Sequence, residues 1–234
     1  MTSHSLRLPR GNPRDARSYW SDATDPGHRH SDPWWLEFYA HELLLYFPET
    51  PGRTLELGCG SGTLYPYLKD RCTEYVGVDF SASMLEEFRG RGHDLELICA
   101  DAADLNVGAG RLQPGSFDFI FSNQVCQFFD RDALDRHLAS IHALLGDGGS
   151  CLVANIPDAE LRRLYYAGAL RGDRAPSWRL GLKAQVKALM GRPDGIGHWF
   201  RRREMANVAG RLFDCKTFSS ASLEYRFHLL LRKP

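Results

Sequence analysis

Glycine occupies every second position from Gly58 to Gly62, directly after a short apolar run that contains Glu56. Glycine permits a tight turn and lets backbone N–H groups approach a ligand closely. A second short apolar run begins at Tyr75 and ends in Asp79, seventeen residues after Gly62. A carboxylate at the end of such a strand can accept hydrogen bonds from the hydroxyl groups of a ribose. These residue types and their spacing therefore predict a binding site for an adenosine-containing ligand.

The spacing of the glycines distinguishes two kinds of adenosine ligand. A dinucleotide-binding loop follows the pattern G-x-G-x-x-G, and Thr63 stands where its third glycine would fall. The pattern present, Glu56-x-Gly58-x-Gly60-x-Gly62, resembles the first motif of class I (Rossmann-like) S-adenosylmethionine-dependent methyltransferases. Later segments resemble that family in the same order along the chain: Cys99–Ala102, Ser116–Asn123 and Leu144–Gly149. The resemblance covers residues 50–156, with Asp147 as a mild departure where the family usually has proline.

The resemblance implies both a fold and an activity. The expected fold is α/β, a doubly wound and mostly parallel seven-stranded sheet with an antiparallel last strand, flanked by helices. The expected activity is transfer of a methyl group from S-adenosyl-L-methionine to an acceptor, with S-adenosyl-L-homocysteine as product. The chain is therefore expected to be an enzyme of this methyltransferase class.

The resemblance also carries over a set of cofactor-binding residues, which are Glu56, Gly58, Cys59, Gly60, Gly62, Asp79, Phe80, Ser81, Met84, Asp101, Ala102, Asn123 and Gln124. The glycine loop would line the methionine end, and Glu56 would lie near the methionine amino group. Asp79 would accept both ribose hydroxyls, and Asp101 would accept the adenine amino group. Ordinary structural roles remain open, because Asp79 could stabilise a helix start, Asp101 could cap a helix, and apolar residues such as Met84 could belong to the core.

The acceptor side of the expected site is less well defined. Many members of the family carry a histidine just after the fourth strand, where this chain reads Asn123–Phe128 without one. Glutamine there can orient a substrate but cannot take its proton near neutral pH. The candidates for a catalytic base are therefore His28, His30 and His198, although each could be a solvated loop histidine. The candidates for acceptor contact are Tyr19, Trp20, Gln127 and Asn155, and no metal site is expected.

Alternating β-rich and helical runs predict the elements that position these residues. Strands are expected near residues 53–57, 74–79, 94–98, 116–122, 150–155, 212–218 and 222–231. Helices are expected near residues 62–70, 81–90, 130–145 and 201–209, with an aromatic helix that starts at Ser31-Asp32-Pro33.

Two regions are expected along the chain. Residues 1–48 would form a flexible arm and the aromatic N-terminal helix, and residues 49–234 would form the methyltransferase core. Residues 158–197 hold two amphipathic stretches, Glu160–Leu170 and Trp178–Met190, and are expected to form a helical cap inserted after the fifth strand. With residues 1–32, this cap would cover the acceptor site at the carboxyl ends of the strands.

Composition limits the partners that the chain can have. Its 29 lysines and arginines equal its 29 aspartates and glutamates, which argues against a surface that binds nucleic acid without specificity. An excess of basic residues in the expected cap could hold an anionic small-molecule acceptor, although solvated faces of amphipathic helices are the more ordinary explanation. The chain shows no secretory leader and no long apolar run, so a cytoplasmic monomer or homodimer is expected. The six cysteines form no C-x-x-C pair, which favours buried reduced thiols.

Three functions stay open at this point. The first is methylation of a hydroxyl oxygen on a small molecule such as a natural product, a sugar or a lipid precursor. The second is N-methylation of a small-molecule amine; planar base nitrogens are disfavoured because the run Ser122–Val125 lacks an Asn-Pro-Pro-Tyr-type motif. The third is a non-catalytic S-adenosylmethionine-binding partner or regulatory protein, which the missing histidine favours.

Overall fold

The computed structural model describes residues 32–170, 193–194 and 196–234. Its sheet has seven strands in the order β3-β2-β1-β4-β5-β7-β6. The strands are β1 Arg53–Leu57, β2 Glu74–Asp79, β3 Glu96–Cys99, β4 Phe117–Asn123, β5 Leu145–Pro157, β6 Asp214–Ser219 and β7 Arg226–Arg232. Neighbours among β1 to β5 are parallel, whereas β7 is antiparallel to both β5 and β6. This topology confirms the expected doubly wound fold and its antiparallel last strand.

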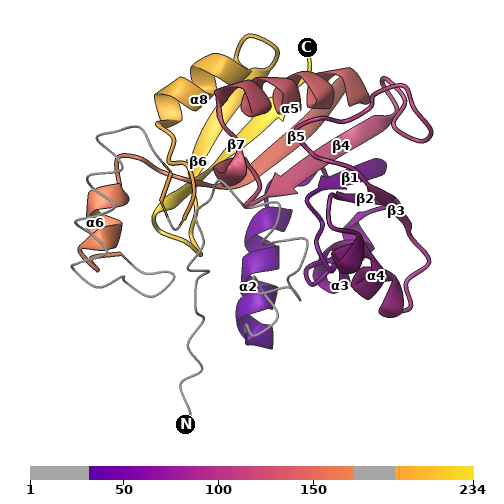
Figure 1. Cartoon of the computed structure of the whole chain (residues 1–234), viewed down its shortest axis with the longest axis horizontal. Helices are drawn as coiled ribbons and strands as arrows, with labels where there is room; N and C mark the ends of the chain where they lie inside the picture. The colour runs from indigo at the N-terminus through magenta and orange to yellow at the C-terminus, as the bar shows by residue number, and fades with distance from the viewer. Residues whose placement is uncertain (1–31, 171–192, 195) are drawn as a thin grey trace.

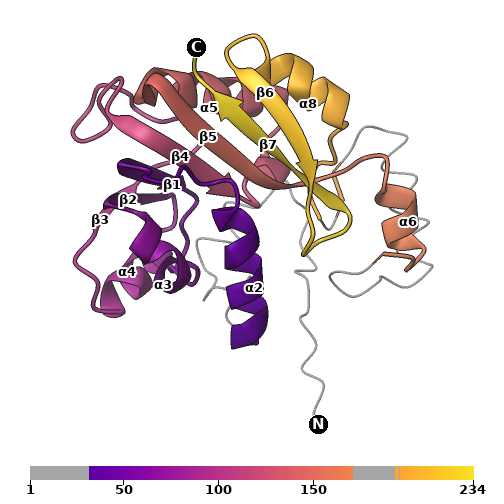
Figure 2. The ribbon, with the colours of Figure 1, turned by 180° about the vertical axis from the view of Figure 1, so that it is seen from behind.

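Helices cover both faces of the sheet. They are α2 Pro33–Leu44, α3 Tyr65–Leu68, the 3-10 turn η2 Lys69–Arg71, α4 Ala82–Gly90, the 3-10 turn η3 Cys126–Phe128, α5 Arg131–Leu144, α6 Arg162–Tyr166 and α8 Arg202–Ala209. The apolar residues of α5 and α8 belong to one core cluster and those of α2, α3 and α4 to another. Figures 1 and 2 show the sheet between these two groups of helices.

Strand β4 shows how the two core clusters form on opposite faces. Successive side chains of a strand point to opposite sides, so Phe119 and Phe121 join the cluster beneath α2 while Ile120 joins the cluster beneath α5. Strand β4 is buried on both faces from Phe119 onward, and Phe119–Phe121 form the short continuous apolar run that such burial favours. The central position of β4 therefore places its carboxyl end in the middle of the molecule.

Helix α2 begins where the sequence predicts. The Asp32 side chain caps it by accepting a hydrogen bond from the backbone N–H of Trp34 at 3.1 Å, and Pro33 occupies the first turn. Tyr39, Ala40 and Leu43 are fully buried on its inner face. The inner face of α2 thus joins the core cluster that contains Phe119 and Phe121, while Trp34 and Phe38 on its other side are exposed.

The chain beyond β5 is described at both ends of the expected insertion. Helix α6 follows β5, and the stretch Trp178–Met190 lies outside the described residues. The Asp194 carboxylate accepts hydrogen bonds from Arg162 Nη2 at 2.5 Å and from Trp199 Nε1 at 2.8 Å. Both ends of the insertion are therefore held to each other at its base.

Two further expectations concern membrane-spanning helices and the state of the cysteines. In the described ranges, no helix combines the length and the apolar character that crossing a membrane requires. All six cysteines are free thiols, and Cys59, Cys126 and Cys151 are buried. The expectation of a buried thiol is wrong for Cys99, which is exposed because it ends the edge strand β3.

Candidate cofactor and acceptor site

A cavity of about 390 Å³ lies at the carboxyl ends of β1, β2 and β4. The chain order reverses between β1 and β4, which is where ligands bind in open α/β sheets. Most of the residues predicted to bind cofactor line this cavity: Glu56, Gly58, Cys59, Gly60, Asp79, Phe80, Met84, Asp101, Ala102, Asn123 and Gln124. Gly62 and Ser81 do not line it. The fold therefore gathers residues from segments far apart in the sequence into one site.

The glycine loop presents backbone to this cavity. Gly60 has φ +54°, and a Cβ placed on it would meet no atom within 4 Å, so its backbone faces open space. Gly58 has φ +80°, and a Cβ there would lie 2.4 Å from Val125 Cγ2. Both φ values lie in the left-handed region that favours glycine. The loop therefore requires glycine for its conformation at both positions and for close packing at Gly58.

Asp79 connects the glycine loop to the start of α4. Its Oδ2 accepts a hydrogen bond from the Gly60 N–H and its Oδ1 accepts one from the Ser81 N–H, each at 2.9 Å. Ser81 in turn caps α4, because its hydroxyl accepts a hydrogen bond from the Met84 N–H at 3.4 Å. The Asp79 carboxylate is therefore fixed in place by backbone, while it still lines the cavity.

Glu56 is a buried carboxyl group at the floor of the cavity, only 4% exposed. Burial raises the pKa of Glu56, the hydrogen bond from the Tyr75 hydroxyl lowers it and the nearby Asp79 raises it, and together they give a pKa of about 7. A group that titrates near neutral pH inside a cavity marks a functional position. Glu56 is therefore poised to lose its proton when a cation enters the cavity.

The loop after β3 forms another wall of the cavity. Asp101 Oδ1 accepts a hydrogen bond from the Ala103 N–H at 2.9 Å, and the Ala102 carbonyl lies 2.7 Å from Nδ1 of His137. His137 is fully buried, and burial lowers its pKa to about 4. Neutral His137 therefore supports the loop from behind by donating its Nδ1 hydrogen to the Ala102 carbonyl.

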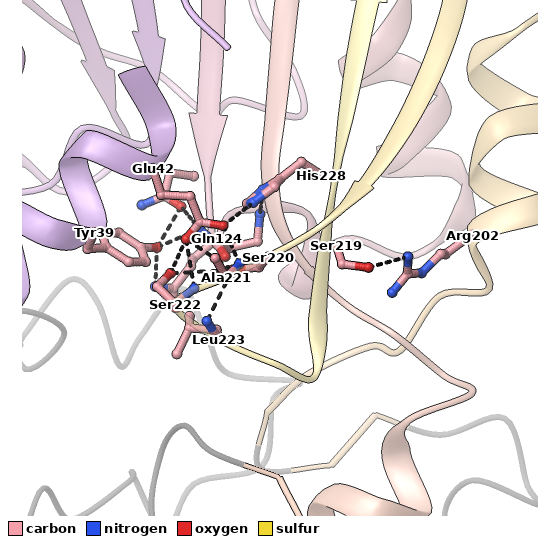
Figure 3. Close-up of polar contacts among 12 residues, drawn as sticks. Tyr39, Glu42, Gln124, Arg202, Ser219, Ser220, Ala221, Ser222, Leu223 and His228 are labelled. Carbon is pink, nitrogen blue, oxygen red and sulfur yellow. Dashed lines mark hydrogen bonds and ion pairs between the residues drawn. The ribbon is translucent and has the colours of Figure 1, made fainter. Parts of the chain in front are cut away.

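The residues at and after the end of β4 form another wall of the cavity, and Tyr39 of α2 is hydrogen-bonded to them. The Tyr39 hydroxyl donates to Asn123 Oδ1 and accepts hydrogen bonds from Gln124 Nε2 and Asn155 Nδ2, each at 2.8 Å. Figure 3 shows Tyr39 reaching from its helix to Gln124. Gln124 and Asn155 have φ values of +58° and +57°, uncommon for residues other than glycine. Such strained backbone persists where its surroundings hold it, as this network does.

The acceptor candidates fall in different places. Gln127 lines the cavity, whereas Asn155 is fully buried in the Tyr39 network and does not line it. The His198 side chain is half-buried and does not line the cavity either, and burial lowers its pKa. Its backbone N–H nevertheless donates to the Gln127 carbonyl at 2.7 Å, which brings the end of the insertion against the cavity wall. Tyr19, Trp20, His28 and His30 lie outside the described residues.

Glu42, also on α2, binds the connection between β6 and β7. Its carboxylate accepts hydrogen bonds from the backbone N–H groups of Ala221 and Ser222 at 2.5 and 2.9 Å. His228 Nδ1 accepts from the Asn155 N–H, so its Nε2 carries the hydrogen that is donated to Glu42 at 3.0 Å (Figure 3). Burial raises the pKa of Glu42, but these hydrogen bonds outweigh it and hold the pKa at about 2. This cluster fastens α2 to the last hairpin.

Four residues that were not predicted from the sequence support the site from behind the cavity wall: Tyr39, Glu42, His137 and Arg226. A signal existed for two of them, because Glu42 and His137 are polar residues on helix faces that are otherwise apolar, beside Leu43 and Leu138. Tyr39 reads as an ordinary core aromatic, and Arg226 opens a strand as many surface arginines do. Only the three-dimensional arrangement shows what these last two contact.

Comparison with known families identifies the chain's domain. Residues 55–153 match the profile of a family described as a methyltransferase domain. The chain is also similar in structure to the N-methyltransferase NodS from Bradyrhizobium japonicum WM9 in complex with S-adenosyl-l-homocysteine, with a TM-score of 0.64 and 14% identity over 96% of this chain and 100% of that chain. At this identity, the likeness to NodS establishes the fold alone.

Curated relatives resemble this chain over part of their length. It is 33% identical to a probable non-canonical nonribosomal peptide synthetase of Salinispora arenicola over 59% of this chain and 2% of the relative. It is 26% identical to malonyl-[acyl-carrier protein] O-methyltransferase of Pseudescherichia vulneris over 50% of this chain and 44% of the relative. It is 34% identical to 18S rRNA (guanine-N(7))-methyltransferase of Bos taurus over 51% of this chain and 44% of the relative. The matches span less than half the length of each of these relatives.

The sheet order, the glycine loop and the domain match together define the class I methyltransferase fold. Residues 55–153 thus carry a methyltransferase domain, and the chain has the fold of the class I S-adenosylmethionine-dependent methyltransferases.

Proposed function

We propose that this chain transfers a methyl group from S-adenosylmethionine to an oxygen atom of a small-molecule acceptor. The observation that carries this proposal is the cavity at the ends of β1, β2 and β4, which joins the open backbone of Gly60 to three carboxyl groups. These carboxyl groups, on Glu56, Asp79 and Asp101, come from different loops and share the cavity. A single carboxylate with a purely structural role would not require two further carboxyl groups in the same cavity.

The lining residues fit the parts of the cofactor. Glu56 would take the methionine ammonium group, and the Gly58–Gly60 backbone would lie along the methionine end. Asp79 accepts one backbone N–H on each oxygen, and the same carboxylate would accept the ribose hydroxyls. Asp101 and the Ala102 backbone would contact adenine, with Phe80 and Met84 against the ring. When bound, S-adenosylmethionine supplies an electrophilic methyl carbon on a sulfonium sulfur.

The protein's own contribution to the reaction is placement. Methyl transfer is an in-line displacement, so holding the acceptor atom opposite the departing sulfur supplies much of the acceleration. Gln127 lines the cavity, and His198, the residue that directly follows the insertion, donates its backbone N–H to the Gln127 carbonyl. The insertion would thereby exclude water and hold the acceptor against the cofactor.

Two other functions compete with this proposal. Methylation of an amine would use the same cofactor site, and the structurally similar NodS is an N-methyltransferase. A cofactor-binding protein without transferase activity is the second, favoured because no histidine is among the described residues that line the cavity.

Cofactor binding and methyl transfer can be tested in two steps. Calorimetry should show binding of S-adenosylmethionine and S-adenosylhomocysteine and no binding of NAD. Incubation with methyl-labelled S-adenosylmethionine and panels of hydroxylated, carboxylic and amine compounds should then give a labelled small-molecule product. Binding of NAD without S-adenosylmethionine would overturn the cofactor assignment, and labelled products confined to amines would overturn oxygen as the acceptor.

A further inference from the structure

Arg226 fixes the orientation of a side chain in the cavity wall. It is 2% exposed at the start of β7, and its Nη1 donates to Gln127 Oε1 at 2.5 Å and to the Asn155 carbonyl at 2.6 Å. A guanidinium group has donors and no acceptor, so only the carbonyl end of the Gln127 amide can face it. The amide NH₂ of Gln127 is therefore turned away from Arg226.

Arg226 itself has little freedom to move. Its backbone N–H donates to the Leu223 carbonyl at 2.8 Å, and its own carbonyl accepts from the Ser220 N–H at 3.0 Å. Its guanidinium lies 4.9 Å from the centroid of the Tyr225 ring. An arginine confined on several sides holds Gln127 in one orientation, and Gln127 is itself only 8% exposed.

The other glutamine of this wall has the opposite orientation. Gln124 donates its Nε2 to the Tyr39 hydroxyl, which leaves its carbonyl for the cavity. One of the two N–H donors of Gln124 is thus used by Tyr39, whereas the hydrogen bond of Gln127 with Arg226 uses only its carbonyl oxygen and leaves both of its N–H donors for a bound acceptor. The positive charge of Arg226 lies one side chain behind it, and charge acts more strongly in a buried site than in water.

We propose that Gln127 donates a hydrogen bond to a carboxylate group of the acceptor, with Arg226 as its positioning residue. This inference rests on the proposed function and names the acceptor class. One carboxylate oxygen would be held by Gln127 and the other would attack the methyl carbon. An oxygen–carbon bond forms, the sulfur–carbon bond breaks, and the bonding pair stays on sulfur as a neutral thioether.

A carboxylate acceptor explains a feature of the cavity lining. A carboxylic acid has already lost its proton at neutral pH, so its methylation releases none and requires no general base. The absence of histidine from the described lining residues is then compatible with catalysis. The anionic carboxylate and the cationic sulfonium neutralise each other as the neutral ester and thioether form.

The substitution Gln127→Glu tests this inference with little change in shape. The new carboxylate would still accept from Arg226, so folding and S-adenosylhomocysteine binding should be preserved. It would present an oxygen in place of the NH₂ group, and methylation of carboxylic acids should fall by at least about 50-fold, from one lost hydrogen bond and one added repulsion. The assay uses methyl-labelled S-adenosylmethionine with a panel of mono-, di- and tricarboxylic acids and records base-labile methyl esters.

Two further variants serve as references. Gln127→Met removes the donor without adding charge and should also reduce ester formation, mainly through KM. Gln113→Glu makes the same charge change at an exposed position away from the cavity lining, and it also removes a side-chain NH₂ group, which there donates to the carbonyls of Gly108 and Gly110. Because these contacts are local to its own loop, ester formation should stay within about 2-fold of wild type.

The outcomes separate this inference from the proposed function. Loss of cofactor binding in the wild type would defeat the proposed function. Intact cofactor binding with methylation of amines or phenols only, or equal ester formation by wild type and Gln127→Glu, would overturn the carboxylate proposal alone. If the panel yields no product, NMR of the wild-type protein tests the proposal. The side-chain NH₂ signal of Gln127 is identified by its absence from the spectrum of Gln127→Glu, and the proposal requires that added malonate shift this signal. A shift with methylammonium and none with malonate overturns the proposal.

Discussion

Asp79 accepts hydrogen bonds from two backbone N–H groups, so its carboxylate has a structural task beside the proposed ribose contact. Hydrogen bonds to a charged group are worth about 1.5–3 kcal/mol each. Asp79→Asn places an NH₂ group against one of these N–H donors and removes the charge. We expect affinity for S-adenosylhomocysteine, measured by calorimetry, to fall by at least about tenfold.

A matched control for this change is Asp104→Asn, because Asp104 is exposed in the loop that follows β3 and does not line the cavity. It should bind S-adenosylhomocysteine as wild type does. If Asp79→Asn retained wild-type affinity while its unfolding temperature fell, the carboxylate would have only its structural task.

Glu56 predicts a pH dependence for cofactor binding. Its pKa of about 7 in the free protein means that half the molecules carry a neutral carboxyl group at that pH. An incoming ammonium group favours the ionised form, so S-adenosylmethionine affinity should rise as pH increases from about 6 to 8. Calorimetry across this range should show the rise in wild type and a flat profile in Glu56→Gln. A rise of equal size in both proteins would contradict the assignment.

The same group affects the stability of the free protein in the opposite direction. Its folded pKa is raised from 4.5 to about 7, so its favourable contribution is fully present below pH 4.5 and is lost as pH rises through about 7. The cofactor would offset this loss by stabilising the carboxylate.

At the scale of elements, helix α2 depends on one buried carboxylate. Glu42→Gln would keep the shape and lose the charge that accepts hydrogen bonds from Ala221, Ser222 and His228. We expect an unfolding free energy at pH 7 lower by about 2 kcal/mol or more, measured by denaturant titration. Glu37→Gln, on the exposed face of the same helix, should be nearly neutral.

The pH dependence of this effect has a defined sign. Because the pKa of Glu42 is lowered from 4.5 to about 2, its contribution is present above pH 4.5 and is lost as pH falls toward 2. The difference between wild type and Glu42→Gln should therefore shrink between pH 4.5 and pH 2. A difference that stayed constant across this range would mean that the charge of Glu42 does not hold the helix.

The end of the insertion offers a second test at this scale. Gly197 has φ +115°, and a Cβ there would lie 2.3 Å from the Gln127 carbonyl oxygen. Gly197→Ala should push this segment away from the cavity wall and reduce acceptor turnover while cofactor binding persists. Gly108→Ala is the control, because Gly108 has φ +93° and open space around its Cβ position, so it introduces backbone strain without the clash. Equal turnover by both variants would show that the contact is dispensable.

Most elements could be predicted from the sequence because their signals are local. Alternating apolar runs and a capped start, Asp32-Pro33, predict the strands and α2 to within a few residues. Strand β5 is longer than predicted, since it begins at Leu145, which pairs with Phe117 across a register shift. The predicted helix at 62–70 is shorter and starts only at Tyr65, because Gly62 with φ +71° still belongs to the turn.

The site was predictable only where a motif lies within one segment. The glycine loop and Asp79 were found from their spacing, and both line the cavity with the loop after β3. Tyr39 and Arg226 meet Gln124 and Gln127 across 85 and 99 positions of sequence. Local periodicity carries no information about contacts at such separations, so sequence reasoning could not find them.

At the scale of the whole molecule, we expect residues 1–32 and 158–197 to cover the acceptor side together. Deletion of residues 1–31 keeps Asp32 as the cap of α2, so S-adenosylhomocysteine binding should survive while acceptor turnover is lost. Limited proteolysis should also cut residues 158–197 more slowly when the cofactor is present. Normal turnover by the truncated protein, with equal cutting in both states, would show that these segments are peripheral.

The hydrogen bonds that join Glu42 of α2 to the connection between β6 and β7 also set an order of events during synthesis. Glu42 and its partners at Ser220, Ala221 and Ser222 are separated by 178 to 180 positions. At about 5–20 residues per second, the hairpin leaves the ribosome roughly 10–35 s after the helix. Until the hairpin is available, α2 is not fixed by Glu42, so Tyr39 is not held where it hydrogen-bonds to the residues after β4. A nascent chain can thus form its glycine loop early, but it completes the cavity only after its last two strands have been synthesised. We therefore expect it to have no activity during synthesis.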